Sequence, residues 1–311
     1  MMMRTIHTPI LPTLVTFVTL FAVFTTLESL VIPLPAATSA ESLKGVVLER
    51  LSDGERVDLG EALSATVSGS KTMIVAASHT ADFNTIEYGQ QIRFYWDQMK
   101  EKGIERCLMV MNGQPSSCTK LQELLDLPEG LEIYPDSEGT AGRSLGVSRG
   151  FAPDNADIPA SWKVTVVGFG FGPPWGTLPA VLTGYFGNPN GHREWIEASL
   201  RQGQLAGRWP KVLELDDDES SNHAILANKF DNFPLVSGWG RRPFELATLR
   251  LQNILDIQIK FWQELKPVHD PCLTQLGGCM IVGENGAPLF SWVDRGLCDI
   301  PDMKKVLEDL N

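Results

Sequence analysis

Three short strand patterns that alternate with helical patterns constrain the fold of this chain more than any other feature. They span residues 72–77, 107–111 and 131–134, and the first two have the length and apolar composition of buried strands. After the first segment, the apolar residues from Phe83 to Met99 fall mostly on one helical face. After the second, a shorter helical pattern carries Cys118, Leu121, Leu124 and Leu125. This βαβαβ order predicts an α/β fold with parallel strands and right-handed crossovers.

Hairpins and further helices are expected on both sides of this centre. The turn pairs Asp53-Gly54 and Asn285-Gly286 each separate two strand patterns, which predicts hairpins over residues 45–59 and 279–293. The remaining helical patterns span residues 192–205, 241–265 and 300–310.

Residues 150–240 interrupt the alternation, because glycine, proline and tryptophan are frequent there. We expect an insertion packed on the domain, with an acidic, solvated loop over residues 213–222. The glycines of residues 168–172 suggest a dinucleotide-binding loop, but Pro173 stands where that motif needs its third glycine. None of the five cysteines has Cys-x-x-Cys or zinc-ligand spacing. The sequence therefore predicts neither a nucleotide cofactor nor a metal.

The first forty residues are expected to form a leader outside the fold, which leaves residues 41–311 as one domain. No charged side chain occurs from Thr8 to Leu27, Arg4 precedes this run, and residues 36–40 are small, as at a cleavage site. A retained membrane anchor is the alternative, and it would be the one membrane contact. The net charge of −12 argues against nonspecific binding to nucleic acid.

Several segments resemble a known family. They are residues 82–88, 176–178, 184–187, 242–253, 273–278 and 294–296. Together they resemble the peroxiredoxin-like branch of the AhpC/TSA family, which is found in photosynthetic organisms. The resemblance covers about residues 44–300. It implies a thioredoxin-like fold with the N-terminal hairpin of peroxiredoxins and a large insertion at about residues 150–240. It also implies antioxidant thiol chemistry and, with the leader, a chloroplast or thylakoid location; secretion is the alternative.

Two positions depart from the catalytic members of that family. Those enzymes carry Thr-x-x-Cys at the turn after the first strand, and here Thr80 is followed by Phe83 in place of the peroxidatic cysteine. They also place an arginine just before the late hairpin, where this chain has Leu276. The thioredoxin-type proline is replaced too, since Gly277 and Gly278 occupy that place. A thiol peroxidase needs a thiolate and a cation that lowers its pKa, so the usual site is incomplete.

Cys118 is the best remaining candidate for a reactive thiol. It lies in the first turn of a predicted helix, where the helix dipole favours a thiolate. The alternative is a packing role, because Cys118 shares an apolar stripe with Leu121 and Leu125. Cys279 invites the same two interpretations, and a Cys272–Cys298 disulfide is a further hypothesis.

Polar residues near the turn allow simpler interpretations. His79 can act as a base or ligand, but a single histidine in a turn is more often exposed or part of a cap. Asp82 is well placed to cap the following helix. Arg241 and Arg242 can bind an anion, although a helix N-terminus is an unfavourable place for positive charge.

Two functions remain open. The first is a redox protein that reduces a peroxide or exchanges thiols through Cys118, with a thiol reductant as partner. The second is a non-catalytic thioredoxin-like module that binds a protein or an apolar ligand through aromatic residues of the insertion. Those residues are Phe169, Phe171, Trp175 and Tyr185. A thiol of depressed pKa distinguishes the two, because the first function alone requires one.

Overall fold

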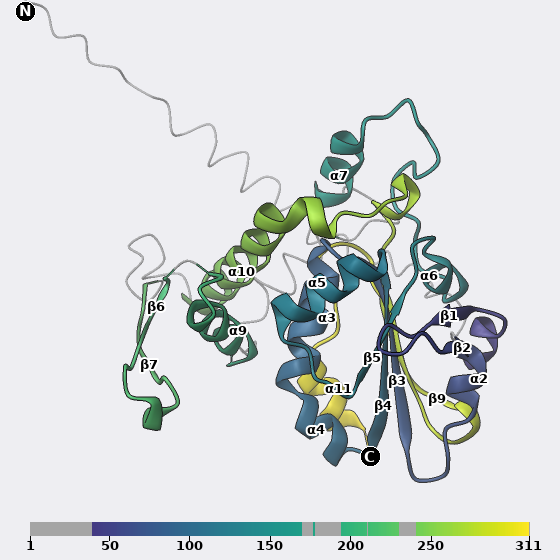
Figure 1. The fold of residues 1–311 in the computed structure, drawn as a ribbon, viewed down its shortest axis with the longest axis horizontal. Helices are drawn as coiled ribbons and strands as arrows, with labels where there is room; N and C mark the ends of the chain where they lie inside the picture. The colour runs from purple at the N-terminus through teal and green to yellow at the C-terminus, as the bar shows by residue number, and fades with distance from the viewer. Residues whose placement is uncertain (1–38, 170–176, 178–193, 210, 230–240, 311) are drawn as a thin grey trace, which may run out of the picture. The chain divides into compact units, whose positions relative to one another are not determined.

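A mixed sheet with the strand order β5-β4-β3-β8-β9 forms the centre of the fold (Figure 1). The computed structural model describes residues 39–169, 177, 194–209, 211–229 and 241–310. The strands are β3 (Lys71–His79), β4 (Ile104–Asn112), β5 (Leu131–Pro135), β8 (Gly278–Val282) and β9 (Pro288–Val293). As predicted, β3, β4 and β5 run parallel. The sheet as a whole is mixed, because β8 pairs antiparallel with both β3 and β9. The α/β class is confirmed.

Helices cover both faces of this sheet (Figure 1). The described helices include α2 (Leu59–Ser64), α3 (Phe83–Phe94), α4 (Trp96–Glu101), α5 (Pro115–Leu125), α6 (Thr140–Ser144), α9 (Glu194–Leu205), α10 (Arg241–Leu265) and α11 (Met303–Asp309). Successive side chains of a strand point to opposite faces, so β3 contributes to two cores. Met73 and Val75 enter the core shared with α3 and α5, whereas Ile74 and Ala76 enter the core shared with α2 and α6.

The start of α3 follows from local chemistry. Asp82 has extended backbone angles, and its carboxylate accepts a hydrogen bond from the Asn84 amide at 2.8 Å, which confirms the predicted cap. Gly89 allows α3 to approach its neighbour closely, because a Cβ there would lie 2.7 Å from Cδ1 of Leu125.

Two sequence predictions are wrong in part. The helical pattern of residues 83–99 divides into α3 and α4, because Tyr95 has φ −95° and ψ 10°. Residues 213–222 are not simply a loop, since β6 (Leu213–Leu215) pairs antiparallel with β7 (Ile225–Asn228). The short helix α2 was not predicted at all.

The predicted N-terminal hairpin is present and joins the edge of the sheet. Its strands, β1 (Val47–Glu49) and β2 (Arg56–Asp58), pair antiparallel. The Leu51 amide then donates a hydrogen bond to the Ile133 carbonyl on β5 at 2.8 Å.

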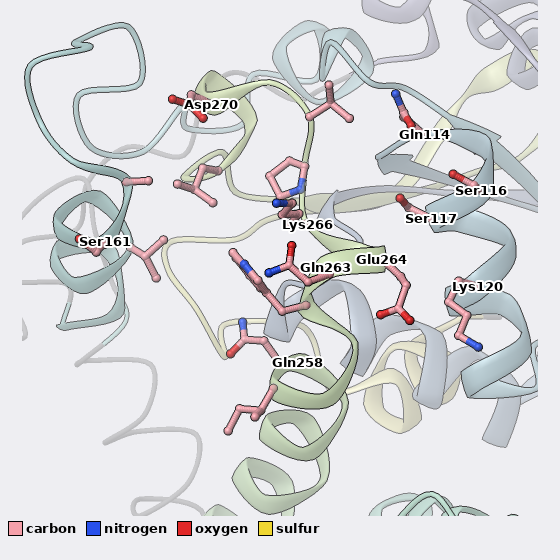
Figure 2. Close-up of a pocket in the computed structure, with 17 residues that line it drawn as sticks. Gln114, Ser116, Ser117, Lys120, Ser161, Gln258, Gln263, Glu264, Lys266 and Asp270 are labelled. Carbon is pink, nitrogen blue, oxygen red and sulfur yellow. The ribbon is translucent and has the colours of Figure 1, made fainter.

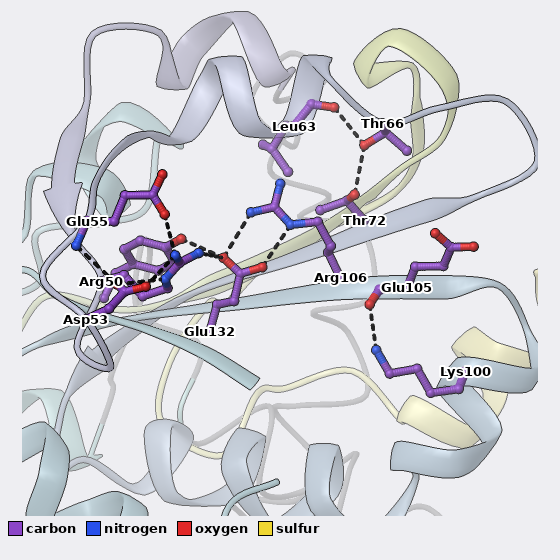
Figure 3. Close-up of polar contacts among 11 residues, drawn as sticks. Arg50, Asp53, Glu55, Leu63, Thr66, Thr72, Lys100, Glu105, Arg106 and Glu132 are labelled. Atoms are coloured by element: carbon purple, nitrogen blue, oxygen red, sulfur yellow. Dashed lines mark hydrogen bonds and ion pairs between the residues drawn. The ribbon is translucent and has the colours of Figure 1, made fainter. Parts of the chain in front are cut away.

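Charged side chains strengthen the same junction (Figure 3). Arg50 forms ion pairs with Asp53 and Glu55 in the hairpin turn and with Glu132 on β5. Glu132 also accepts two hydrogen bonds from Arg106 on β4, at 2.8 and 2.9 Å. The network therefore ties the hairpin to two strands of the central sheet.

The C-terminal elements follow the predicted order. The long helix α10 has the predicted bounds, with non-helical backbone angles at Phe261 only. The late hairpin β8–β9 turns at residues 284–286, and α11 closes the chain.

The described residues lie within one compact unit, residues 36–311. No helix in this described part has the length and apolar character needed to cross a bilayer. The predictions on the leader and on location fall on residues 1–38, outside the described residues.

Candidate functional site

The end of α10 covers the turn between β3 and α3. The Thr80 hydroxyl donates a hydrogen bond to the Leu265 carbonyl, and Nε2 of Gln258 donates one to the Ala81 carbonyl at 2.9 Å. Thr80 has no solvent-exposed surface. Its hydroxyl is therefore already bonded within the protein rather than presented to a substrate.

The two departures from the catalytic pattern are filled by apolar contacts. Phe83 packs against Cys298, as does Leu297. Leu276 is buried, and its amide donates a hydrogen bond to the Ser148 carbonyl at 2.9 Å. Neither position supplies a nucleophile or a cation.

His79 is buried in this turn, so the expectation of an exposed histidine is wrong. Its ring packs edge-to-face on Trp262 of α10, with 6.2 Å between ring centroids. Nε2 lies 4.0 Å from a carboxylate oxygen of Asp82, and Nδ1 has no hydrogen-bond partner among the described residues. Burial lowers the pKa of His79, which favours the neutral imidazole. The histidine is buried because residues distant in sequence pack over it.

Cys118 lies in the first turn of α5, as predicted, but its thiol is fully buried. It belongs to the main core together with Leu121 and Leu125. Burial raises the pKa of Cys118 to about 12, opposite to the shift that a reactive thiol needs. This environment favours the packing interpretation.

The other cysteines are also buried. Burial raises the pKa of Cys107 to about 12 and that of Cys272 to about 11, and it raises the pKa of Cys279 further. No disulfide joins Cys272 to Cys298. The hairpin ladder ends at the pair Gly278–Val293, so it does not reach these two residues.

A buried carboxyl group at the end of β9 was not singled out from the sequence. Asp294 accepts hydrogen bonds from the Tyr88 hydroxyl at 2.8 Å and from Nδ2 of Asn84 at 2.7 Å. Asn84 also accepts one from the Cys298 amide. Burial raises the pKa of Asp294 well above its usual range. These groups are about 210 residues apart in sequence, and no local pattern links them.

A groove of about 1510 Å³ opens on the described part of the chain (Figure 2). It lies between the start of α5, the end of α10 with the loop after it, and α7 (Ala160–Phe169). Its apolar lining includes Val164, Ile259, Trp262 and Val268, and its polar lining includes Gln114, Ser117 and Lys266. We refer to it as the α5–α10 groove.

The groove lies beside the covered turn rather than over it. Trp262 contributes to both, because it lines the groove and packs on His79. Of the aromatic residues expected to bind a ligand, Phe171, Trp175 and Tyr185 lie outside the described part of the chain. The side chains of Phe169, Arg241 and Arg242 are likewise outside it.

Comparison with known proteins adds no family or relative. No family model, no curated protein and no solved structure matches this chain.

Proposed function

We propose that this chain is a thioredoxin-like module of the peroxiredoxin-like branch that binds a protein partner and carries out no thiol catalysis. The strand arrangement supports the fold in this proposal. β3 and β4 are parallel with α3 between them, and β8 lies antiparallel between β3 and the edge strand β9. A hairpin precedes this unit and a long segment separates β5 from α10, as the resemblance implies.

The chemistry of the thiols supports a non-catalytic role. A thiol peroxidase attacks peroxide with a thiolate, so it needs an accessible cysteine of lowered pKa. All five cysteines are buried, and burial raises the pKa at Cys107, Cys118, Cys272 and Cys279. The turn that would hold the peroxide instead has its Thr80 hydroxyl bonded to Leu265.

The α5–α10 groove is the observation that carries the binding role. Ile259, Val268 and Val164 line it with 73%, 53% and 37% of their surface exposed. The groove also exceeds the range of about 300–1,000 Å³ that is usual for small-molecule pockets. An amphipathic groove of this size suits a polypeptide segment better than a small ligand.

A photo-crosslinking residue at Ile259 tests this proposal in the full-length chain. The matched control places the same residue at Val67, which is 64% exposed and does not line the groove. We expect Ile259 to crosslink a protein that Val67 does not. With that partner purified, Ile259→Asp should weaken binding by about tenfold or more, since burying an isoleucine is worth about 1.5–3 kcal/mol.

Val67→Asp should leave the affinity unchanged. Equal crosslinking at both positions, or equal affinities of the two variants, would refute the groove as a docking site. Turnover of hydrogen peroxide with dithiothreitol that disappears in Cys118→Ser would instead support the redox function.

A further inference from the structure

We infer that the α5 end of the groove binds the terminal carboxylate of a polypeptide whose last residue is apolar. This inference rests on the proposed binding function and names the part of the partner that enters the groove. Three features of the described residues carry it: an uncapped helix start, a hydroxyl that faces the groove without a partner, and an apolar wall.

The first turn of α5 has backbone donors without acceptors. Gln114 at the N-cap makes no side-chain capping bond, and Pro115 occupies the first helical position. The first amide to find a backbone acceptor is that of Cys118, which bonds to the Gln114 carbonyl. Within the described part of the chain, the amides of Ser116 and Ser117 donate to no group. Amides at such a helix start attract an anion through both their hydrogens and the helix dipole.

Ser117 gives independent support for a ligand at this position. Its side chain lines the groove although the residue is only 6% exposed. Its hydroxyl forms no hydrogen bond with any described residue, whereas the neighbouring Thr119 hydroxyl bonds to the Pro115 carbonyl at 3.0 Å. In Figure 2 the Ser117 hydroxyl points from α5 toward the groove. Because this hydroxyl faces the groove and has no partner in the described part of the protein, it can exchange a hydrogen bond with a group bound there.

The charges that line the groove favour a singly charged anion. Lys120 and Lys266 are balanced by Glu264 and Asp270, so the side chains alone give no net attraction. The remaining positive feature is the start of α5, which is equivalent to about half an elementary charge. This suits a carboxylate and disfavours the double charge of a phosphate.

The apolar wall on the α10 side favours an apolar side chain next to that carboxylate. Trp262, Ile259 and Val268 form an apolar surface on the α10 side. A C-terminal residue is the one unit of a polypeptide in which a carboxylate and an apolar side chain leave the same carbon. Aspartate and glutamate side chains within a chain lack that combination, so the two walls together fit a chain end.

Two pools of dye-labelled hexapeptides test this inference by fluorescence polarisation with the full-length chain. Both pools end in leucine, valine or phenylalanine after random residues; one has a free carboxylate and the other a C-terminal amide. We expect the acid pool to bind at least about tenfold more tightly, because hydrogen bonds to a charged group are worth about 1.5–3 kcal/mol. Ser117→Asp should abolish this preference, and Ser117→Ala should reduce it.

Thr119→Asp is the matched control, because it adds the same charge near the same helix start on an exposed residue that does not line the groove. It should keep the preference for the acid. If both pools bind equally and Ile259→Asp abolishes this binding, carboxylate recognition is refuted, but the groove remains the binding site. Lack of binding by either pool, or a preference that persists in Ser117→Asp, would also overturn the inference. The proposed function is tested separately by the crosslinking experiment, in which equal crosslinking at Ile259 and Val67 would refute it.

Discussion

Replacing Gly203 with alanine should destabilise this protein, although the same change stabilises most helices. Gly203 lies inside α9, where exchanging glycine for alanine normally gains about 1 kcal/mol. Here, however, a Cβ would lie 0.7 Å from Nε1 and 0.8 Å from Cδ1 of Trp209. These atoms cannot overlap, so the indole ring must leave its position against the helix.

The size of the effect follows from what Trp209 loses. This side chain is 8% exposed and belongs to the main core. Truncating a buried tryptophan to alanine costs about 3–5 kcal/mol, which is an upper bound for expelling it. Subtracting about 1 kcal/mol for the better helix former leaves a net loss of at most about 2–4 kcal/mol in the free energy of unfolding.

Denaturant unfolding of the full-length protein, followed by circular dichroism, measures this loss. Gly168→Ala is the matched control, because Gly168 is also helical and a Cβ there would have no described neighbour within 4 Å. It should be neutral or stabilising. Gly203→Ala should cost much less when Trp209 is already alanine, because no ring then has to move. A Gly203→Ala variant as stable as the wild type, or additive costs in the double variant, would refute the reasoning.

Three further predictions concern charge and thiol chemistry. Burial raises the pKa of Asp294, so the folded protein keeps a proton that the unfolded chain releases near pH ~4. The free energy of unfolding should therefore fall by up to about 1.4 kcal/mol per pH unit as the pH rises from there toward the folded-state pKa. Asp294→Asn should lack this slope in unfolding curves taken from pH ~4 to ~8, and an unchanged slope would contradict the assignment. With its pKa raised to about 12, Cys118 should be about one part in ten thousand thiolate at pH ~8, so peptide mass mapping should find it alkylated only after unfolding. Glu132→Gln should cost about 1 kcal/mol, and less in high salt, because it removes the charge that pairs with Arg106 and Arg50; a salt-independent cost would argue against the ion pairs as its source.

The central strands and the long helix were predictable because their patterns are local. Residues 73–77 and 107–111 are continuous apolar runs, and they lie in β3 and β4. The helical stripe that starts at Arg241 continues to Leu265, as predicted. In contrast, α2 has only six residues, too few for its periodicity to be recognised.

The candidate site was less predictable, because its properties depend on contacts between distant segments. The sequence places His79 in a polar turn, and nothing near it indicates that Trp262 packs on its ring. The contact from Thr80 to Leu265 joins residues 185 positions apart. The buried state of Cys118 was one of two alternatives that helix position alone does not separate.

The covered turn and the open groove depend on the same part of α10. Trp262 and Leu265 lie within its last turn, where one packs on His79 and the other accepts the hydrogen bond of Thr80. Trp262 also lines the groove, together with Ile259 on the preceding turn. A cysteine in place of Phe83 would still lack a cation to lower its pKa, because Leu276 stands where catalytic peroxiredoxins place an arginine, so restoring the thiol alone should not restore peroxide reduction. The end of α10 therefore both covers the turn after β3 and forms one wall of the groove that we propose binds a partner.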